Sequence, residues 1–168
     1  MDIATTLKEL QDRCHQASYD AGWWHHAETG LPYIPGDKVL SSEGSHPLPW
    51  FMIDKAQRDL ITHYWPITVA CKIALIHSEV SEAMEAHRKG LMDDKLVHRL
   101  GMETEISDAM IRQFDIAGAM TRAATLGIVT SHQHDMNIGT AFIEKMTFNA
   151  TRPDHKITVR LAQGGKKY

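Results

Sequence analysis

The feature that most constrains this fold is helical periodicity in the stretch from Pro66 to Lys89. Apolar residues recur there at intervals of three and four, which is the spacing of one face of an α-helix. These residues are Val69, Ile73, Ile76, Val80, Ala83 and Met84. Proline fits the first turn of a helix because no amide hydrogen is needed there, and glycine, here Gly90, is favoured just past the end. We therefore expect a helix from Pro66 to Lys89.

Four other segments have helical periodicity, and no segment predicts a strand. The segments run from about Ile3 to Ala21, Phe51 to Tyr64, Leu100 to Leu126 and Met136 to Thr151, and Pro153 prevents the last helix from continuing. The 168 residues are enough to bury a core without a stabilising disulfide or metal. We therefore expect an all-α fold, a four-to-five-helix bundle in which residues 1–168 form a single domain.

The stretch from about residue 22 to residue 50 interrupts the helices because glycine and proline are spread along it. Loops longer than roughly 12 to 15 residues are uncommon in compact domains and often cover a site, so we expect either a lid or a surface insertion. Its aromatic residues either stack on a base or pack against the bundle, and for Trp23 and Trp24 we favour packing. The others are Tyr33 and Trp50. A basic tail covers about residues 154–168.

The composition excludes several classes of protein. The formal net charge of −3 argues against binding to duplex nucleic acid, which depends on a basic surface. The longest apolar runs are far shorter than the roughly 20 residues of a membrane span, and residues near the amino terminus are charged, so we expect a cytoplasmic protein. Cys14 and Cys71 lack the spacing of a zinc site, and we expect both to be reduced thiols.

Two pairs of acidic residues stand at the same spacing on consecutive expected helices. Glu79 and Glu82 are three residues apart, and so are Glu105 and Asp108. Residues three apart lie about 60° apart around an α-helix, so both carboxylates of a pair reach the same point. Each pair borders the apolar stripe of its helix. If the stripes pack face to face, the four acids converge beside the seam.

Four converging carboxylates repel one another and lose hydration, a cost that a hard divalent cation offsets. Oxygen ligands favour Mg²⁺ over zinc, and Mg²⁺ is commonly held by a few carboxylates together with substrate phosphates. A ferritin-like di-iron site is disfavoured because it requires Glu-x-x-His on two helices. The motif occurs here from Glu43 to His46, inside the loop. The alternative without a ligand is that the acids form a solvated helix face.

These acids stand in a pattern that resembles a known family. The segment from Ile76 to Glu85, followed by Glu105 to Asp108, is similar to the E-x-x-E, spacer, E-x-x-D pattern of the MazG-like all-alpha nucleoside triphosphate pyrophosphohydrolases. The stretches from Asp108 to Asp115 and from Glu144 to Pro153 resemble a phage-type subgroup of that family. The three motifs come in the order of the family and cover about residues 72–155.

The resemblance implies that Glu79, Glu82, Glu105 and Asp108 hold Mg²⁺ or Mn²⁺. It implies hydrolysis of a nucleoside triphosphate between its α- and β-phosphates to the monophosphate and pyrophosphate. We expect a carboxylate of Glu79 or Glu82 to orient the attacking water. Many members have an acid where Ser78 stands here, which leaves the number of metal ions open.

The resemblance also implies that Lys145, Asn149 and Arg152 contact the nucleotide, and their spacing places them on one helix face. Arg112 either contacts a phosphate or forms an ion pair with Asp108 or Asp115. All of these residues lie in the two segments that resemble the phage-type subgroup.

The expected substrate is a purine nucleotide, with dGTP first, because some phage relatives act on dGTP. The alternatives are hydrolysis of a phosphoribosylated nucleotide and a non-catalytic helical interaction or regulatory protein. A bundle of this size leaves an acidic site near the surface, so we expect a homodimer or homotetramer that completes the pocket.

Overall fold

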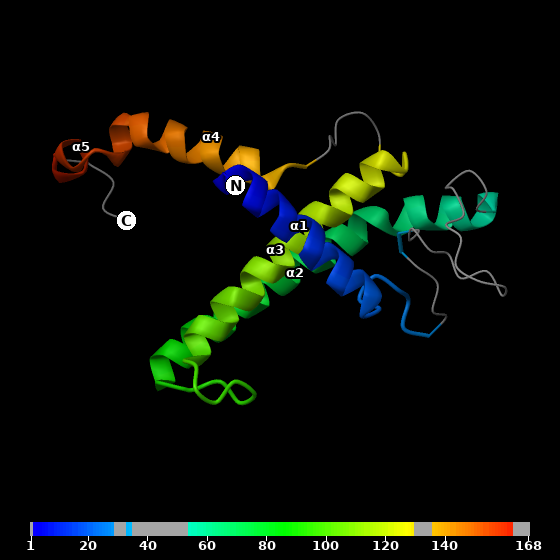
Figure 1. Cartoon of the computed structure of the whole chain (residues 1–168), viewed down its shortest axis with the longest axis horizontal. Coiled ribbons are helices and arrows are strands. Elements are labelled where there is room, and N and C mark those ends of the chain that lie inside the picture. Colours follow the sequence, from blue (N-terminus) through cyan, green and yellow to red (C-terminus); the bar gives the residue numbers. More distant parts are fainter. Residues whose placement is uncertain (1, 29–32, 35–53, 130–135, 163–168) are drawn as a thin grey trace. The chain divides into compact units, whose positions relative to one another are not determined.

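The regular elements of the described chain are helices. The computed structural model describes residues 2–28, 33–34, 54–129 and 136–162, and no strand occurs among them. Helices α1 (Ile3–Asp20), α2 (Lys55–Lys89), α3 (Gly101–Thr125) and α4 (Ile138–Thr151) are followed by the short η2 (Pro153–His155) and α5 (Ile157–Leu161) (Figure 1). The prediction of an all-α fold is confirmed. Within the described ranges, no helix combines the length and apolar character needed to cross a membrane.

Contacts group the chain into two compact units. One unit covers Leu10–Met136 and contains most of α1 together with α2 and α3, and we call it the larger unit. The other combines Met1–Glu9 with Asn137–Tyr168 and contains the start of α1 together with α4, η2 and α5; we call it the smaller unit. The four acidic residues predicted as metal ligands all belong to the larger unit.

A short, hydrogen-bonded connection folds α2 and α3 into an antiparallel hairpin (Figure 1). Gly90 ends α2 in the left-handed region with φ 64° and ψ 39°, and its N–H bonds back to the carbonyls of Ala86 and His87. Met92 and Leu100 then pair as an antiparallel bridge. Because the connection closes on itself, α3 must return along α2.

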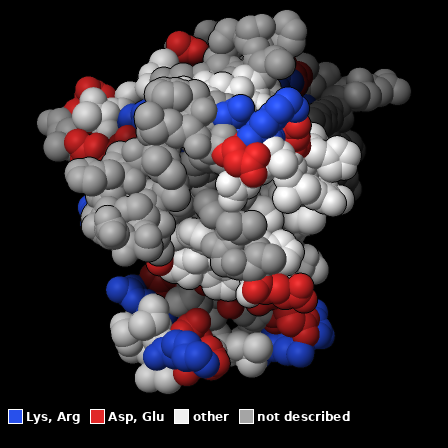
Figure 2. All heavy atoms as spheres, turned by 90° about the vertical axis from the view of Figure 1, so that its right-hand side faces the viewer, with Lys and Arg blue, Asp and Glu red and all other residues white. Residues whose placement is uncertain are grey.

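Acidic and basic side chains alternate at the turn of this hairpin, which is the lower end of Figure 2. Glu85 accepts from Arg88 at 2.8 Å and from Lys89 at 2.5 Å, and Arg99 pairs with Glu103 at 2.8 Å. These pairs are exposed, so each contributes little to stability. Charges of both signs are therefore mixed at this end of the hairpin.

Helix α2 continues through Pro66, where the sequence predicted a break between two helices. Pro66 has no N–H, so it cannot bond to the carbonyl of Thr62, a loss that costs about 3 kcal/mol. Burial of Ile61 and Trp65 before the proline, together with partial burial of Val69 after it, offsets this cost. The prediction of a helix ending at Tyr64 was therefore wrong, whereas the end at Lys89 is confirmed.

The core of the larger unit is built around two tryptophans. The rings of Trp24 and Trp65 stack with centroids 6.2 Å apart. The buried cluster contains Trp24, Ile34, Ile61, Trp65, Ala119, Ala123 and Ile128. The alanines of α3 leave room for these rings. Packing of Trp24 is confirmed, but Trp23 is 63% exposed, so the same prediction was wrong for Trp23. Trp50 lies outside the described residues.

The contact between α2 and α3 buries fewer side chains of the α2 apolar stripe than the sequence pattern predicted. Small side chains such as Ala83 and Ala109 are buried in it. Ile73, Val80 and Met84, which belong to the predicted apolar stripe, are 46%, 56% and 68% exposed. Helix α2 is thus rotated so that the acidic border of its stripe, rather than the centre, lies near α3.

In the smaller unit, α4 crosses the first turns of α1 at close range. Gly139 makes this possible, because a Cβ there would lie 2.0 Å from the carbonyl oxygen of Ala4. Pro153 ends α4 and begins η2, as predicted from its missing amide hydrogen. The described part of the basic tail contains the short helix α5, which the sequence did not predict.

Candidate metal centre

Three of the four predicted acids converge between α2 and α3. Glu79, Glu105 and Asp108 each offer one carboxylate oxygen, and these oxygens all lie within 4.8 Å of one another. Glu79 is buried, Glu105 is half-buried and Asp108 is exposed, so the group is anchored in the seam and open on one side. The donors are carboxylate oxygens, which suit a hard cation such as Mg²⁺ or Mn²⁺.

The local fold explains this convergence. Glu79 lies one turn before Ala83, and Glu105 lies one turn before Ala109. Each acid is therefore on the same helix face as the small buried residues between α2 and α3. The small side chains let the two backbones approach closely. Asp108 is three residues beyond Glu105 and therefore shares its helix face.

The charges of the acids destabilise one another's ionised forms. Partial burial, a hydrogen bond with Glu79 and the nearby charges of Glu82, Glu79 and Asp108 raise the pKa of Glu105 to about 7. Burial also raises the pKa of Asp108, with the charge of Glu79 acting in the same direction and Arg112 opposing it. A bound cation would relieve both effects, because it favours the ionised carboxylates.

Glu82 lies outside this group of three. Its Oε1 accepts a hydrogen bond from the Ser78 hydroxyl at 2.9 Å, and both side chains are on the exposed part of α2. Its charge nevertheless raises the pKa of Glu105 and Asp108. Glu82 as a fourth ligand stays a prediction.

Arg112 pairs with an acid on the other helix. Its Nε donates to Oε1 of Glu79 at 2.5 Å, and the side chains of Arg112 and Glu79 are 34% and 8% exposed. The sequence had suggested Asp108 or Asp115 as its ion-pair partner. That prediction considered only acids on α3, whereas the antiparallel hairpin brings α2 within reach.

A small cavity of about 180 Å³ adjoins the acids. Asp108 and Arg112 line it together with Ser18, Trp23, Lys72, Ile111 and Asp115. It therefore combines two cations, two carboxylates, an aromatic ring and an aliphatic side chain. The sequence analysis gave no role to Lys72, although it stands seven residues, or two helical turns, before Glu79. That spacing was the available signal.

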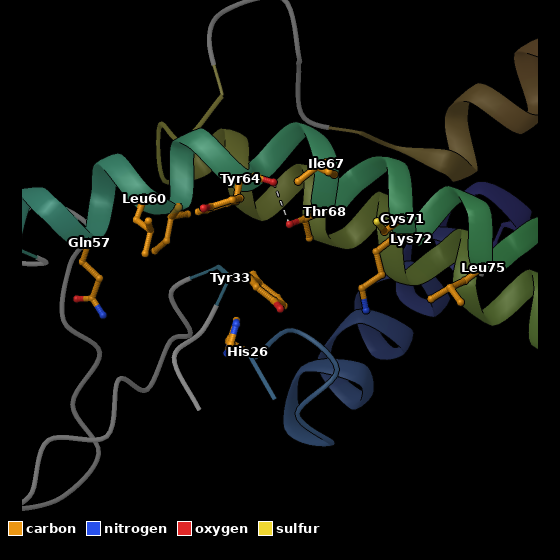
Figure 3. A pocket seen from close by; sticks show the side chains of 11 residues that line it. His26, Tyr33, Gln57, Leu60, Tyr64, Ile67, Thr68, Cys71, Lys72 and Leu75 are labelled. Carbon is orange, nitrogen blue, oxygen red and sulfur yellow. Dashed lines mark hydrogen bonds between the residues drawn. The ribbon is translucent and has the colours of Figure 1, made fainter. Parts of the chain in front are cut away.

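A larger groove of about 680 Å³ runs along α2. Its walls are mainly apolar, and His26 and Tyr33 face the α2 side chains Leu60, Tyr64 and Lys72 across it (Figure 3). Glu79, Glu105 and Asp108 do not line this groove. Of these three acids, Asp108 lines the smaller cavity instead.

The predicted nucleotide-contacting residues of α4 lie in the smaller unit. Lys145 is exposed, with its Nζ 5.2 Å from the centre of the Phe148 ring. Arg152 pairs with Asp154 through two hydrogen bonds of 3.0 and 2.6 Å. Asn149 is half-buried, and among the described residues its buried Oδ1 has no hydrogen-bond partner. The role predicted for these three residues stays a prediction.

No protein-family model matches this chain, and neither a curated protein nor a solved structure was found to be similar to it. The resemblance to the MazG-like family therefore rests on the order and spacing of the motifs.

Proposed function

We propose that this chain hydrolyses a nucleoside triphosphate between its α- and β-phosphates, releasing the monophosphate and pyrophosphate. The observation that carries the proposal is the convergence of Glu79, Glu105 and Asp108 from two helices within 4.8 Å. The order of the E-x-x-E, E-x-x-D and last-helix motifs supports it further. The favoured substrate is a purine deoxynucleotide, with dGTP first, since the resemblance is to a phage-type subgroup.

Under this proposal Glu79, Glu105 and Asp108 hold Mg²⁺ or Mn²⁺, and Glu82 joins them as the fourth acid. A cation held there would polarise phosphate oxygens and lower the pKa of a water. A carboxylate of the Glu79 and Glu82 pair orients that water and accepts its proton. The guanidinium of Arg112, which lines the cavity beside Asp108, supplies positive charge for the phosphates.

A homo-oligomer, dimer or tetramer, is part of the proposal. Large apolar side chains of α2 and α3 are exposed in the single chain, among them Ile73, Val80, Met84, Ile106 and Met110. Exposed apolar groups on two adjacent helices suit burial against a second copy. Such a copy would also enclose the open side of the acidic site.

The test is to incubate the chain with each ribo- and deoxynucleoside triphosphate and Mg²⁺ or Mn²⁺, and to separate the products. We expect monophosphate and pyrophosphate in equal amounts. Glu79→Gln and Asp108→Asn should lower kcat by a factor of about 100 or more, because each removes a charged ligand. Glu85→Gln, on the same helix and paired at the surface with Arg88, is the matched control.

The ion pair between Arg112 and Glu79 favours a second candidate, a non-catalytic helical protein whose acids have internal partners. Thermal unfolding distinguishes the two. A true site raises the melting temperature when Mn²⁺ and nucleotide are added together, because ligands stabilise the folded state by mass action. No shift and no product from any nucleotide would favour the non-catalytic protein.

A further inference from the structure

The cavity beside the acids is lined in part by a buried carboxylate, that of Asp115. Asp115 is only 6% exposed, and its Oδ1 accepts from Nε1 of Trp24 at 2.7 Å and lies 2.9 Å from Nδ1 of His15. Two aromatic side chains therefore hold it in place. A carboxylate has roughly four lone-pair sites, so these contacts leave it able to accept from a ligand.

A lysine from the opposite helix lines the same cavity. Nζ of Lys72 donates to the Trp23 carbonyl at 2.7 Å and lies 4.4 Å from the centre of the Trp24 ring. Burial lowers the pKa of Lys72, while the charge of Asp115 opposes that shift. An ammonium group has three N–H donors, so Lys72 can donate to a ligand without leaving Trp23.

Lys72 and Asp115 lie at the same level of the hairpin, away from the acids. Lys72 is seven residues before Glu79 on α2, and Asp115 is seven residues after Asp108 on antiparallel α3. Both spacings are two helical turns, or about 10 Å, and both lead away from the hairpin turn. A ligand held by its phosphates at the acids therefore projects its other end toward these residues.

We propose that Lys72 and Asp115 recognise a base with a carbonyl next to a ring N–H, and this inference rests on the proposed function. Lys72 donates to the carbonyl, and Asp115 accepts from the N–H. Guanine, hypoxanthine, uracil and thymine have this edge. Adenine and cytosine instead present an amino group and a ring nitrogen without hydrogen. The amino group would then face the Lys72 ammonium, another donor, and the ring nitrogen would face the Asp115 carboxylate, another acceptor. Trp23 and Ile111 supply apolar contact.

The test compares dITP with dATP, which differ only at this edge. With Mn²⁺, we expect wild-type kcat/KM to be at least about tenfold higher for dITP, because buried polar groups reject an analogue that leaves them unpaired. Lys72→Met and Asp115→Asn should bring this ratio close to one, chiefly by raising KM for dITP. Lys55→Met and Asp59→Asn are the matched controls, since this pair is exposed on α2.

The outcomes separate the inference from the function it rests on. If no triphosphate is cleaved, the proposed function fails, and the inference fails with it. If both nucleotides are cleaved at equal kcat/KM, or if Lys72→Met keeps the wild-type ratio, the inference alone is overturned. Circular dichroism checks that the variants fold. If Asp115→Asn does not fold, Lys72→Met decides, because its side chain is half-buried and leaves Asp115 with Trp24 and His15.

Discussion

Glu105 gives the larger unit a pH-dependent stability. Its pKa is 4.5 in an unfolded chain and about 7 in the folded one, so between these values the folded state binds more protons. The free energy of unfolding therefore falls as pH rises from 4.5 through 7, and the loss is complete above the folded pKa. Asp108, whose pKa is also raised, contributes in the same direction.

The measurement is urea unfolding of wild type and Glu105→Gln across this pH range. We expect the variant to lose part of the decline, because glutamine does not titrate. The difference between the two curves isolates Glu105 from other titrating groups. A difference that is constant with pH would contradict the raised pKa.

Mn²⁺ should reverse the destabilisation caused by these acids. At a concentration of 100 times Kd, a ligand adds about 2.7 kcal/mol to the free energy of unfolding. We expect a rise in melting temperature with Mn²⁺ for wild type and for Glu85→Gln, and none for Glu79→Gln or Asp108→Asn. Glu82→Gln should give a smaller rise and no turnover, as a fourth ligand requires. If Mn²⁺ raised the melting temperature of Glu82→Gln as much as that of wild type, Glu82 would not be a metal ligand.

At the residue scale, the sequence predicted three of the acids that converge but did not predict the ion-pair partner of Arg112. The three-residue spacing placed Glu105 and Asp108 on one face because helix geometry alone decides this, but it paired Glu79 with Glu82, which lies outside the group of three. The pairing of Arg112 with Glu79 depends on the separation and rotation of two helices, which no local pattern contains. Lys72 was missed although its spacing of seven residues from Glu79 places both on one face of α2.

At the scale of elements, the crossing of α1 and α3 depends on a glycine. A Cβ at Gly118 would lie 2.4 Å from Cβ of His15, closer than side chains pack. Gly118→Ala must therefore push the helices apart, and overpacking of this kind costs about 1–3 kcal/mol. Urea unfolding should show the loss, while Gln113→Ala, at an exposed site on α3, should leave the midpoint nearly unchanged. Equal midpoints for the two variants would mean that α1 and α3 can accommodate the added Cβ without loss of stability.

Helix boundaries were predictable where backbone chemistry decides them. Gly90 and Pro153 end their helices as expected, because one adopts the left-handed region and the other lacks a donor. Pro66 was misread because its local preference to begin a helix was overcome by the burial of Ile61 and Trp65. The sequence did not predict which side of α2 packs against α3, because the apolar stripe covers more of the helix surface than the contact with α3 does.

At the scale of the whole molecule, the exposed side chains of α2 and α3 predict self-association. Met84 is 68% exposed, and replacing it with lysine would place a charge in the expected interface. Light scattering at micromolar concentration should report a dimer or tetramer for wild type and a smaller species for Met84→Lys. Gln16→Lys adds the same charge at an exposed site on α1 and should leave the mass unchanged. A monomeric wild type would contradict the proposed oligomer.

The hydrogen bond from Arg112 to Glu79 has a consequence for the order of binding. A divalent cation on Glu79 would repel the guanidinium that already donates to Oε1 of the same carboxylate, so metal binding should weaken this ion pair. The Arg112 guanidinium lines the cavity, where a weaker pair with Glu79 leaves more of its N–H donors for an anionic ligand. Metal and nucleotide should then each tighten the other's binding, because such coupling is reciprocal. Arg112 would thereby oppose binding of the metal ion and support binding of the nucleotide.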